Sequence, residues 1–215
     1  MDRLQSACLG IVFLDIEAVS PAGEVLFTAR EAARAMNMGP RRLRSFTASR
    51  TALKRLCRQL NLVEKDRADK AIETLRPDEV RPCLADSGLY CSVSHSGSWV
   101  FAVAHKHPIG VDLEMISEKV LKTRRLFMSP GESGLISLSG MSPERTVARI
   151  WTVKEAAAKL WGLQLFQAFR QAEVVRVGKE EGMMRYKDRE YPVRHSEGDG
   201  YVITLIRDED PQGGV

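Results

Sequence analysis

The sequence has few of the residues that cross-link small secreted proteins or bind soft metals. Only four cysteines and four histidines occur among its 215 residues. Cys8, Cys57, Cys83 and Cys91 show neither a C-x-x-C spacing nor a neighbouring histidine cluster. This pattern argues against both a zinc site and a disulfide framework. We therefore expect four reduced thiols, most of them buried.

Long hydrophobic runs are also missing. No stretch approaches the roughly 18 apolar residues of a membrane-spanning helix, and the segment Met1–Asp15 contains no small-residue cleavage site before acidic residues begin. Apolar residues make up 44% of the chain and charged residues 28%, which is the balance of a globular protein with a sizeable core. The sequence therefore predicts a soluble, cytoplasmic protein that does not bind membranes.

A large excess of one charge is absent, because the formal net charge is only +4. This value does not require a nucleic-acid partner. The basic residues are nevertheless unevenly distributed: the segment 30–55 contains eight of them and only one acid, Glu31. They are Arg30, Arg34, Arg41, Arg42, Arg44, Arg50, Lys54 and Arg55. Such a run is typical either of a solvated helix face or of a surface that binds an anionic partner.

The first half of the chain alternates between strand and helix patterns. The apolar, β-branched segment 8–16 predicts a strand, and Pro21 and Gly23 predict a turn after it. Leucines at three- to four-residue intervals after Pro40 predict one or two amphipathic helices. Segments 89–93 and 99–104 predict a hairpin.

The second half begins with another strand pattern, at 109–114. Ser129, Pro130 and Glu132 then supply an N-cap hydroxyl, a first-turn proline and a capping-box glutamate, which predict a helix start. A longer helix is predicted from Ser142 to Gly162, and short strands over 172–207.

Helix, hairpin and returning strand thus recur in both halves. We predict an α+β fold with two lobes related by a pseudo-twofold axis, each a small antiparallel sheet packed with a long helix. The predicted boundaries are 1–107 and 108–215.

Two carboxylates stand out on the strand at 109–114. Asp112 and Glu114 are two residues apart, so both side chains project from one face of the sheet. A divalent cation would compensate their charge, and oxygen ligands without cysteine or histidine favour magnesium or manganese over zinc. The alternative is a surface strand with two solvated acids.

Two further residues lie one helical turn apart on the long helix. Glu155 and Lys159 form either a surface i,i+4 salt bridge, or a third metal carboxylate beside a cation that binds phosphate. Near the hairpin turn, Ser94 and His95 supply a hydroxyl and an imidazole that can bind phosphate, and a hydrogen-bonded turn histidine is the alternative. His195 has no comparable context and is expected to be a surface or structural residue.

Three motifs in order, S-V-S-H-S at 92–96, I-G-V-D-L-E at 109–114 and W-T-V-K-E-A-A-A-K at 151–159, resemble the 4'-phosphopantetheinyl transferase superfamily. The length is similar to that of its longer, monomeric branch, typified by the enzymes that activate surfactin and enterobactin synthetases. The resemblance runs from about residue 41 to residue 159.

The resemblance implies that Asp112, Glu114 and Glu155 hold magnesium, with manganese possible, and that Glu155 and Lys159 are catalytic. It also implies contacts to coenzyme A from Arg44, Arg50, Arg81, Ser94, His95, Asp112 and Lys159. Arg81 stands in V-R-P where many members have G-K-P, which keeps the positive charge and puts the loop shape in question. Glu132 matches a family glutamate whose role is less settled, and it is a minor candidate.

The activity that the resemblance implies is transfer of phosphopantetheine from coenzyme A to a serine of an apo acyl or peptidyl carrier protein. 3',5'-Adenosine bisphosphate is the leaving group, and no nucleic acid takes part. We expect the carrier near Arg124, Arg125, Phe127 and Met128. A non-catalytic carrier-binding module and a basic nucleic-acid-binding domain are the competing interpretations, and the acid triplet argues against the first of them.

Overall fold

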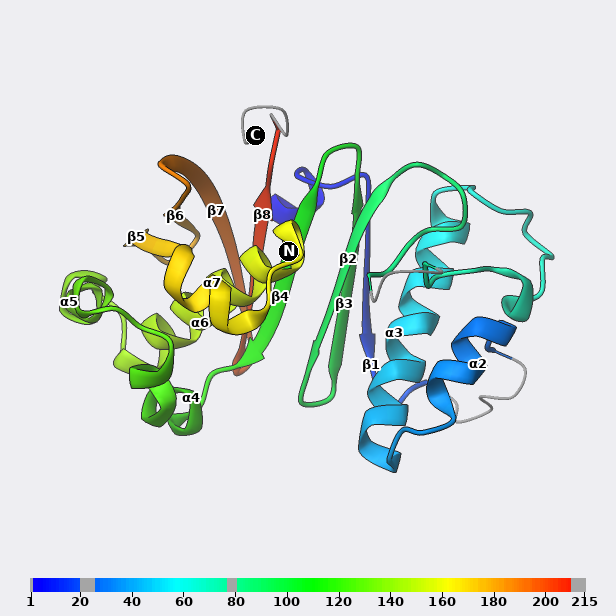
Figure 1. Cartoon of the computed structure of the whole chain (residues 1–215), viewed down its shortest axis with the longest axis horizontal. Coiled ribbons are helices and arrows are strands. Elements are labelled where there is room, and N and C mark those ends of the chain that lie inside the picture. Colours follow the sequence, from blue (N-terminus) through cyan, green and yellow to red (C-terminus); the bar gives the residue numbers. More distant parts are fainter. Residues whose placement is uncertain (1, 20–25, 77–80, 210–215) are drawn as a thin grey trace. The chain divides into compact units, whose positions relative to one another are not determined.

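The computed structural model describes residues 2–19, 26–76 and 81–209. These form two compact units, a first unit within Cys8–Lys106 and a second unit within Met1–Ala7 and His107–Val215. Each unit contains one antiparallel sheet and one long helix against it (Figure 1). The predicted α+β architecture is therefore confirmed for each unit, while the pseudo-twofold relation stays a prediction. The predicted turn at Pro21 and Gly23 lies outside the described residues.

The first unit is a three-stranded sheet covered by helix α3 (Figure 1). Its elements are β1 (Gly10–Asp15), α2 (Ala29–Ala35), α3 (Pro40–Gln59), the 3-10 turn η2 (Asp69–Ala71), β2 (Tyr90–Ser96) and β3 (Trp99–His105). The strand order is β1-β3-β2, all antiparallel. The predicted hairpin is confirmed: Ser96 pairs with Trp99, and Gly97 has a φ of 57°, a conformation that glycine adopts without strain.

The second unit is a five-stranded sheet with strand order β4-β8-β7-β6-β5. Its elements are α1 (Asp2–Gln5), β4 (Ile109–Met115), α4 (Glu118–Thr123), the 3-10 turn η3 (Arg124–Leu126), α5 (Pro130–Leu138), α6 (Pro143–Trp161), α7 (Leu165–Gln171), β5 (Glu173–Val177), β6 (Glu181–Tyr186), β7 (Arg189–Gly198) and β8 (Tyr201–Arg207). Helix α6 lies along β4 and β8.

The helix ends of the second unit follow their local signals. Ser129 and Glu132 form the predicted capping box of α5. At α6, the Ser142 side chain accepts a hydrogen bond from the Arg145 amide, and Gly162 closes the helix in the left-handed conformation with a φ of 65°. The sequence predictions for both helices are confirmed.

The two units share a strand and helix order. In each, a first strand is followed by a capped short helix, a long helix and a hairpin whose second strand pairs with the first strand: β1 with β3, and β4 with β8. The second unit has α4 and η3 before its capped short helix, and α7, β5 and β6 between the long helix and the hairpin.

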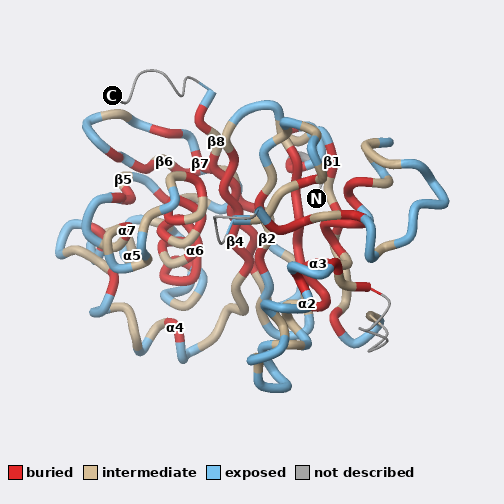
Figure 2. The backbone as a smooth tube through the Cα atoms, turned by 45° about the vertical axis from the view of Figure 1, so that its right-hand side comes forward, coloured by how far each residue is buried: buried red, intermediate tan, exposed pale blue. Residues whose placement is uncertain are grey.

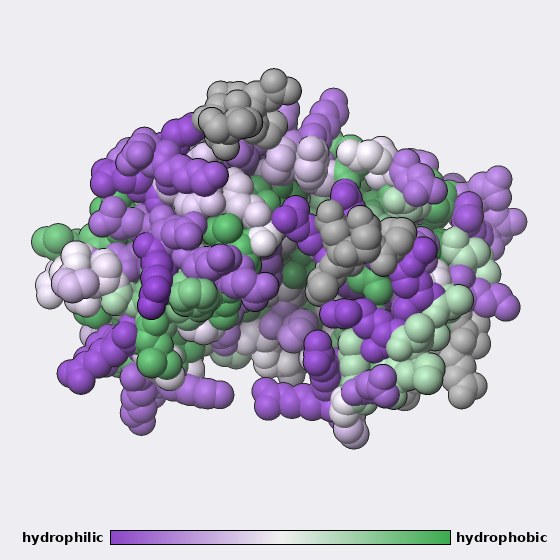
Figure 3. Space-filling model, in the orientation of Figure 1, coloured by the Kyte–Doolittle hydropathy of each residue, from purple (hydrophilic) through white to green (hydrophobic). Residues whose placement is uncertain are grey.

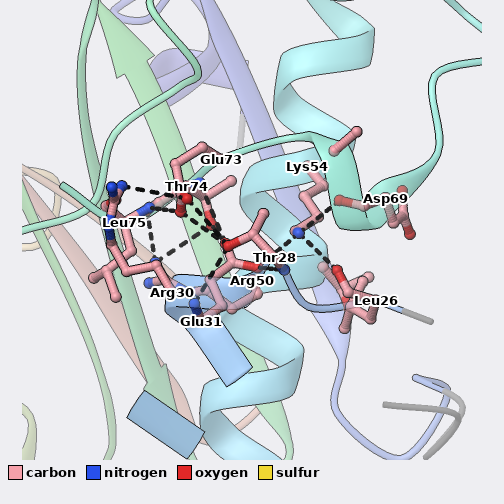
Figure 4. A network of polar contacts seen from close by, with 12 residues as sticks. Leu26, Thr28, Arg30, Glu31, Arg50, Lys54, Asp69, Glu73, Thr74 and Leu75 are labelled. Carbon is pink, nitrogen blue, oxygen red and sulfur yellow. Dashed lines mark hydrogen bonds and ion pairs between the residues drawn. The ribbon is translucent and has the colours of Figure 1, made fainter. Parts of the chain in front are cut away.

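A buried ion pair joins the short helix to the long one in both units. In the first, Glu31 of the Thr28 capping box pairs with Lys54 of α3 at 2.7 Å (Figure 4). In the second, Glu132 of α5 pairs with Lys154 of α6 at 2.9 Å. Because each lysine also donates a hydrogen bond to a backbone carbonyl, the buried ammonium has several acceptors, as a charge removed from water requires.

Strand β4 is more buried than its alternating pattern predicts. Asp112 is 3% exposed and Val111 0%, so side chains on both faces are covered as far as Leu113 (Figure 2). Asp112 is therefore not a solvated surface acid, because α6 lies on the acidic face of the strand. A Cβ at Gly110 would overlap the carbonyl oxygen of Ala156 in that helix, so only glycine allows this close approach.

Among the described residues, no helix is long and apolar enough to cross a bilayer.

Candidate active site

The acidic face of β4 and the helix above it bring three predicted residues together. Asp112 and Glu114 share a face with Gly110, against which α6 is packed. From α6, Lys159 reaches Asp112, with 2.7 Å between its Nζ and Oδ1 of the carboxylate. Lys159 therefore forms an ion pair across to the strand, which the sequence spacing alone did not indicate.

Glu155 lies in the electrostatic field of the same acids. Its pKa is raised from 4.5 to about 7, first by burial and next by the negative charge of Asp112; Lys159 opposes the rise and Glu114 adds to it. Burial and nearby negative charges both disfavour the ionised form of a carboxyl group. Carboxyl groups with a pKa raised in this way are common in functional sites. The three carboxylates thus repel one another in a place where solvent cannot screen them well.

The donor set suits a hard divalent cation, since it consists of carboxylate oxygens. The side-chain arrangement is not that of a closed metal site: among residues 2–19, 26–76 and 81–209, no group of three or more His, Cys, Asp or Glu is placed to hold an ion. Lys159 engages Asp112, and the Oε1 of Glu114 accepts a hydrogen bond from the Met115 amide at 2.9 Å. The residue types fit a cation, and two of the three side chains have other contacts.

Glu132, the minor candidate, has several structural contacts. Besides the capping box and the Lys154 ion pair, its Oε1 accepts a hydrogen bond from the Val174 amide at 2.8 Å. Burial lowers the pKa of Lys154, and the charge of Glu132 opposes this shift. Glu132 therefore joins α5, α6 and β5 within the second unit.

In the first unit, His95 lines a cavity at the start of α3. The cavity has a volume of about 450 Å³ and is lined by Gly39, Pro40, Arg41, Arg42, Ser45 and His95. Two arginines and the first turn of a 20-residue helix make this pocket suitable for an anion. The sequence analysis included these arginines only as part of a basic run; Pro40 as a helix-start signal indicated that they lie in the first turn.

Ser94 is adjacent to His95 in sequence but lies on the other face of β2. It is 5% exposed, whereas His95 is exposed. The structure thus separates the hydroxyl and the imidazole that the sequence analysis had placed in one phosphate site.

The arginines predicted to contact coenzyme A differ in exposure. Arg44 is exposed and pairs with Glu17 at 3.1 Å. Arg50 is 5% exposed, and its Nη1 donates a hydrogen bond to the Thr74 carbonyl at 2.7 Å (Figure 4). Arg81 is exposed beside Pro82, which bridges to Leu75. Arg50 faces the interior of the first unit in this conformation, so its phosphate contact stays a prediction.

The basic run is therefore not a single solvated face. Lys54 is 1% exposed, and it is bound by Glu31 and by the carbonyls of Leu26 and Asp69 (Figure 4). Arg41, Arg42 and Arg55 are exposed. Only part of the run is available to a partner.

The surface suggested for the carrier protein also needs a correction. Phe127 is 2% exposed and packs against Trp151, with 4.9 Å between the ring centres. Its neighbour Leu126 is 75% exposed, and Phe166 of α7 is 56% exposed. Hydrophobic and hydrophilic residues are mixed over the α4 to α7 part of the second unit (Figure 3). Leu126, rather than Phe127, is the apolar residue available beside Arg125.

A buried chain of polar side chains, which the sequence pattern did not indicate, lies next to the acids. Thr152 of α6 bonds to Thr204 of β8 at 2.5 Å between hydroxyl oxygens, and Thr204 bonds to His195 Nδ1 at 2.8 Å. His195 is 4% exposed, so of the two expected alternatives, a surface or a structural residue, only the structural one agrees with its burial. The signal available was Thr204 itself, a polar residue inside the apolar run V-I-T-L-I.

The part of the chain that matches a known protein family contains the acids and Lys159. Residues 108–206 match the 4'-phosphopantetheinyl transferase superfamily, and this segment contains β4, α6 and the acids between them. Over this segment, which is somewhat less than half of its length, the chain is similar to the 4'-phosphopantetheinyl transferase superfamily.

Its curated relatives include transferases and a synthase component. The chain is similar to 4'-phosphopantetheinyl transferase gsp of Aneurinibacillus migulanus, with 30% identity over 42% of this chain and 39% of the relative. It is also similar to enterobactin synthase component D of Escherichia coli strain K12, with 25% identity over 60% of this chain and 64% of the relative. For 4'-phosphopantetheinyl transferase Sfp of Bacillus subtilis strain 168, identity is 30% over 38% of each chain. The matches thus span between 38% and 64% of these relatives.

Proposed function

We propose that this protein transfers the 4'-phosphopantetheine group of coenzyme A to a serine of an acyl or peptidyl carrier protein. The observation that carries the proposal is the convergence of Asp112, Glu155 and Lys159 between β4 and α6, inside the segment that matches the family. Glu114 lies on the same face of β4 and adds to the charge at Glu155.

In the proposed reaction, the serine hydroxyl oxygen forms a bond to the β-phosphorus of coenzyme A. The pyrophosphate P–O bond breaks, and 3',5'-adenosine bisphosphate leaves with the electron pair. Glu155 accepts the serine proton, because a pKa of about 7 leaves an appreciable fraction of the carboxylate ionised near neutral pH. Lys159 provides positive charge for the phosphate oxygens.

Asp112, Glu114 and Glu155 are the residues proposed to hold magnesium or manganese. When bound, such an ion neutralises charge on the pyrophosphate and orients it. The observation in favour is the raised pKa of Glu155, which is caused first by burial and then by the negative charges of Asp112 and Glu114; a cation would relieve the repulsion among the three acids. Lys159 contacts Oδ1 of Asp112 and the Met115 amide contacts Oε1 of Glu114, so an ion would share these carboxylates with the present contacts or displace them.

The cavity beside His95 is proposed to bind a coenzyme A phosphate, with Arg44 and Arg81 as further candidate contacts from the first unit. The double change Arg41→Gln, Arg42→Gln is expected to raise KM for coenzyme A about tenfold or more, because charge-assisted hydrogen bonds are lost. KM for 3'-dephospho-coenzyme A should change little if the lost contact is to the 3'-phosphate.

The matched control for this cavity is Arg55→Gln, on the same helix, exposed and outside the cavity. Steady-state kinetics with both substrates gives the comparison. An equal rise in KM for both substrates would contradict a 3'-phosphate contact in this cavity.

The carrier protein is proposed to dock near Arg124 and Arg125, with Leu126 as the exposed apolar contact. Changing Arg124 and Arg125 to glutamate is expected to raise KM for an acidic carrier about tenfold and leave KM for coenzyme A within twofold, because charge complementarity acts on carrier encounter. The control reverses charge at Arg176 and Lys179, which are exposed in the same unit. If the control has the same effect, or if KM for coenzyme A rises equally, this docking site is wrong.

Transfer itself is tested by incubating the protein with coenzyme A, magnesium and apo carriers of peptide, polyketide and fatty-acid type. The expected result is a mass increase of one phosphopantetheine on at least one carrier, which chelator prevents. Coenzyme A binding without transfer to any carrier would favour the non-catalytic binding module instead. A monomeric state and a cytoplasmic location belong to the same proposal, and size-exclusion chromatography with light scattering tests the first.

A further inference from the structure

A row of polar side chains crosses the sheet of the second unit beside the acids. Asp112 of β4 is directly opposite Thr204 of β8, and Thr204 is directly opposite His195 of β7. Residues directly opposite each other in antiparallel strands share a face, and Asp112 shares the face on which α6 lies. The three residues therefore form one line beneath α6. Thr204 and His195 have no part in the proposed reaction.

Thr152 joins this row to the helix. Its hydroxyl is 2.5 Å from that of Thr204 and donates to the Arg149 carbonyl at 3.0 Å. Thr152 and Thr204 are both 0% exposed. In a dry environment a hydroxyl pair has no water to exchange with, so this contact fixes the height and rotation of α6 on β8.

The direction of the hydrogen bonds follows from counting protons. Since Thr152 donates to the Arg149 carbonyl, its oxygen accepts from Thr204; the oxygen of Thr204 then accepts from Nδ1–H of His195. Burial, together with the positive charge of Arg149, lowers the pKa of His195 to about 3, so the ring is neutral and carries one proton. Nε2 is buried and has no hydrogen-bond partner among the described residues. The Nδ1–H tautomer leaves only a lone pair at Nε2, whereas the other tautomer would bury an N–H without an acceptor.

The anchor lies close to the catalytic groups along both elements. Thr152 is three residues before Glu155 and seven before Lys159, so all three lie near one side of α6. Thr204 is the cross-strand partner of Asp112. A helix held at Thr152 therefore presents Glu155 and Lys159 to Asp112 in a fixed register.

We propose that the chain His195–Thr204–Thr152 is a positioning device that fixes the helix of Glu155 and Lys159 against the strand of Asp112 and Glu114. The inference rests on the proposed function, because the acids are taken as cation ligands. Residues that orient ligands in this way typically change metal affinity or activity by 10- to 100-fold when removed.

The test measures Mn²⁺ binding to the whole protein without coenzyme A, by electron paramagnetic resonance. Thr204→Val keeps the shape and removes the hydroxyl, and it is expected to weaken Mn²⁺ binding about tenfold. Thr204→Ser restores the hydroxyl and should stay within about threefold of the wild type. In the wild type, ¹⁵N spectra of the histidine rings should show the Nδ1–H tautomer for His195.

Thr146→Val is the matched control. Thr146 is on the same helix, is 0% exposed, and its hydroxyl is 2.7 Å from that of Ser139. The Thr146→Val variant therefore loses a partly buried bond between two hydroxyl groups, away from Asp112. Urea unfolding of both variants compares the stability that each one loses. Thr146→Val should bind Mn²⁺ like the wild type.

Two results overturn the inference: wild-type Mn²⁺ affinity in Thr204→Val, or equal weakening in Thr204→Val and Thr146→Val. If the wild type itself does not bind Mn²⁺, the proposed metal centre fails, and the positioning role fails with it.

Discussion

Glu155→Gln is expected to stabilise the protein at about pH 8.5 and at the same time to remove most of its transferase activity. The folded-state pKa of Glu155 is about 7, above its ordinary value of 4.5. Ionisation of this carboxyl therefore destabilises the folded state. That cost is absent below pH 4.5, where the group is protonated in both states, and grows as the pH rises through 7.

The neutral glutamine avoids this cost. We expect a gain in the free energy of unfolding of roughly 1–3 kcal/mol at about pH 8.5, and almost none at about pH 4.5. Urea unfolding of both proteins at the two pH values measures the difference. An equal gain at both pH values, or a loss at the higher one, would show that ionisation of Glu155 does not strain the fold.

Activity should change in the opposite direction. Loss of the proposed base and of one proposed cation ligand is expected to lower the transfer rate by about 10²- to 10⁴-fold. Gained stability with lost activity would mark Glu155 as a residue retained for function at a cost in stability.

The second large effect is expected from Lys159→Met. Lys159 pairs with Asp112 at 2.7 Å and so competes with a cation for the same carboxylate. At about pH 8.5, and without coenzyme A, removal of the ammonium should tighten Mn²⁺ binding about tenfold, a change of roughly 1.4 kcal/mol, because a repulsive charge is lost from a poorly screened site. The transfer rate should nevertheless fall about 100-fold, since the phosphate loses its cation.

Lys122→Met is the control for this variant. Lys122 pairs with Glu118 at 3.0 Å, one turn apart on the exposed surface of α4, and such pairs contribute little. Neither Mn²⁺ binding nor transfer should change in it. Weaker Mn²⁺ binding in Lys159→Met would mean that Lys159 helps to organise the acids and does not compete with the ion.

Much of the fold could be predicted from local sequence signals such as helix caps and turns. The Ser129 and Glu132 capping box, the Ser142 N-cap and the Gly162 closure each depend on residues within one or two turns, so the sequence suffices to predict them. The hairpin around Gly97 is similar. The same holds for the shared face of Asp112 and Glu114, which follows from strand geometry alone.

Long-range partners were beyond the sequence pattern. Glu31 and Lys54 are 23 positions apart, and Arg50 binds Thr74, 24 positions away. The spacing of charges describes only one face of a single helix. It therefore predicted that Arg50 and Lys54 belong to a basic surface. Phe127 was assigned to the surface for the same reason, although Trp151 and Phe169 cover its ring.

A comparison of β1 with β4 shows why the acidic face occurs in only one of the two units. A Cβ at Gly10 would approach Leu56 and Leu60, and a Cβ at Gly110 would meet Ala156 and Leu160. Two and four residues further on, β1 has Val12 and Leu14, whereas β4 has Asp112 and Glu114. The shared strand and helix order is thus combined with an acidic face only in the second unit, and the few matching residues are too dispersed to appear as a sequence repeat.

The most direct test of the acidic site is the initial rate of phosphopantetheine transfer by Asp112→Asn beside the wild type, followed by intact-mass spectrometry of the carrier while magnesium is raised. Asparagine keeps the shape and removes the charge that Lys159 binds and that raises the pKa of Glu155. We predict a rate at least about 100-fold lower that excess magnesium does not restore. A rate within twofold of the wild type at every magnesium concentration would contradict a reaction centred on these acids.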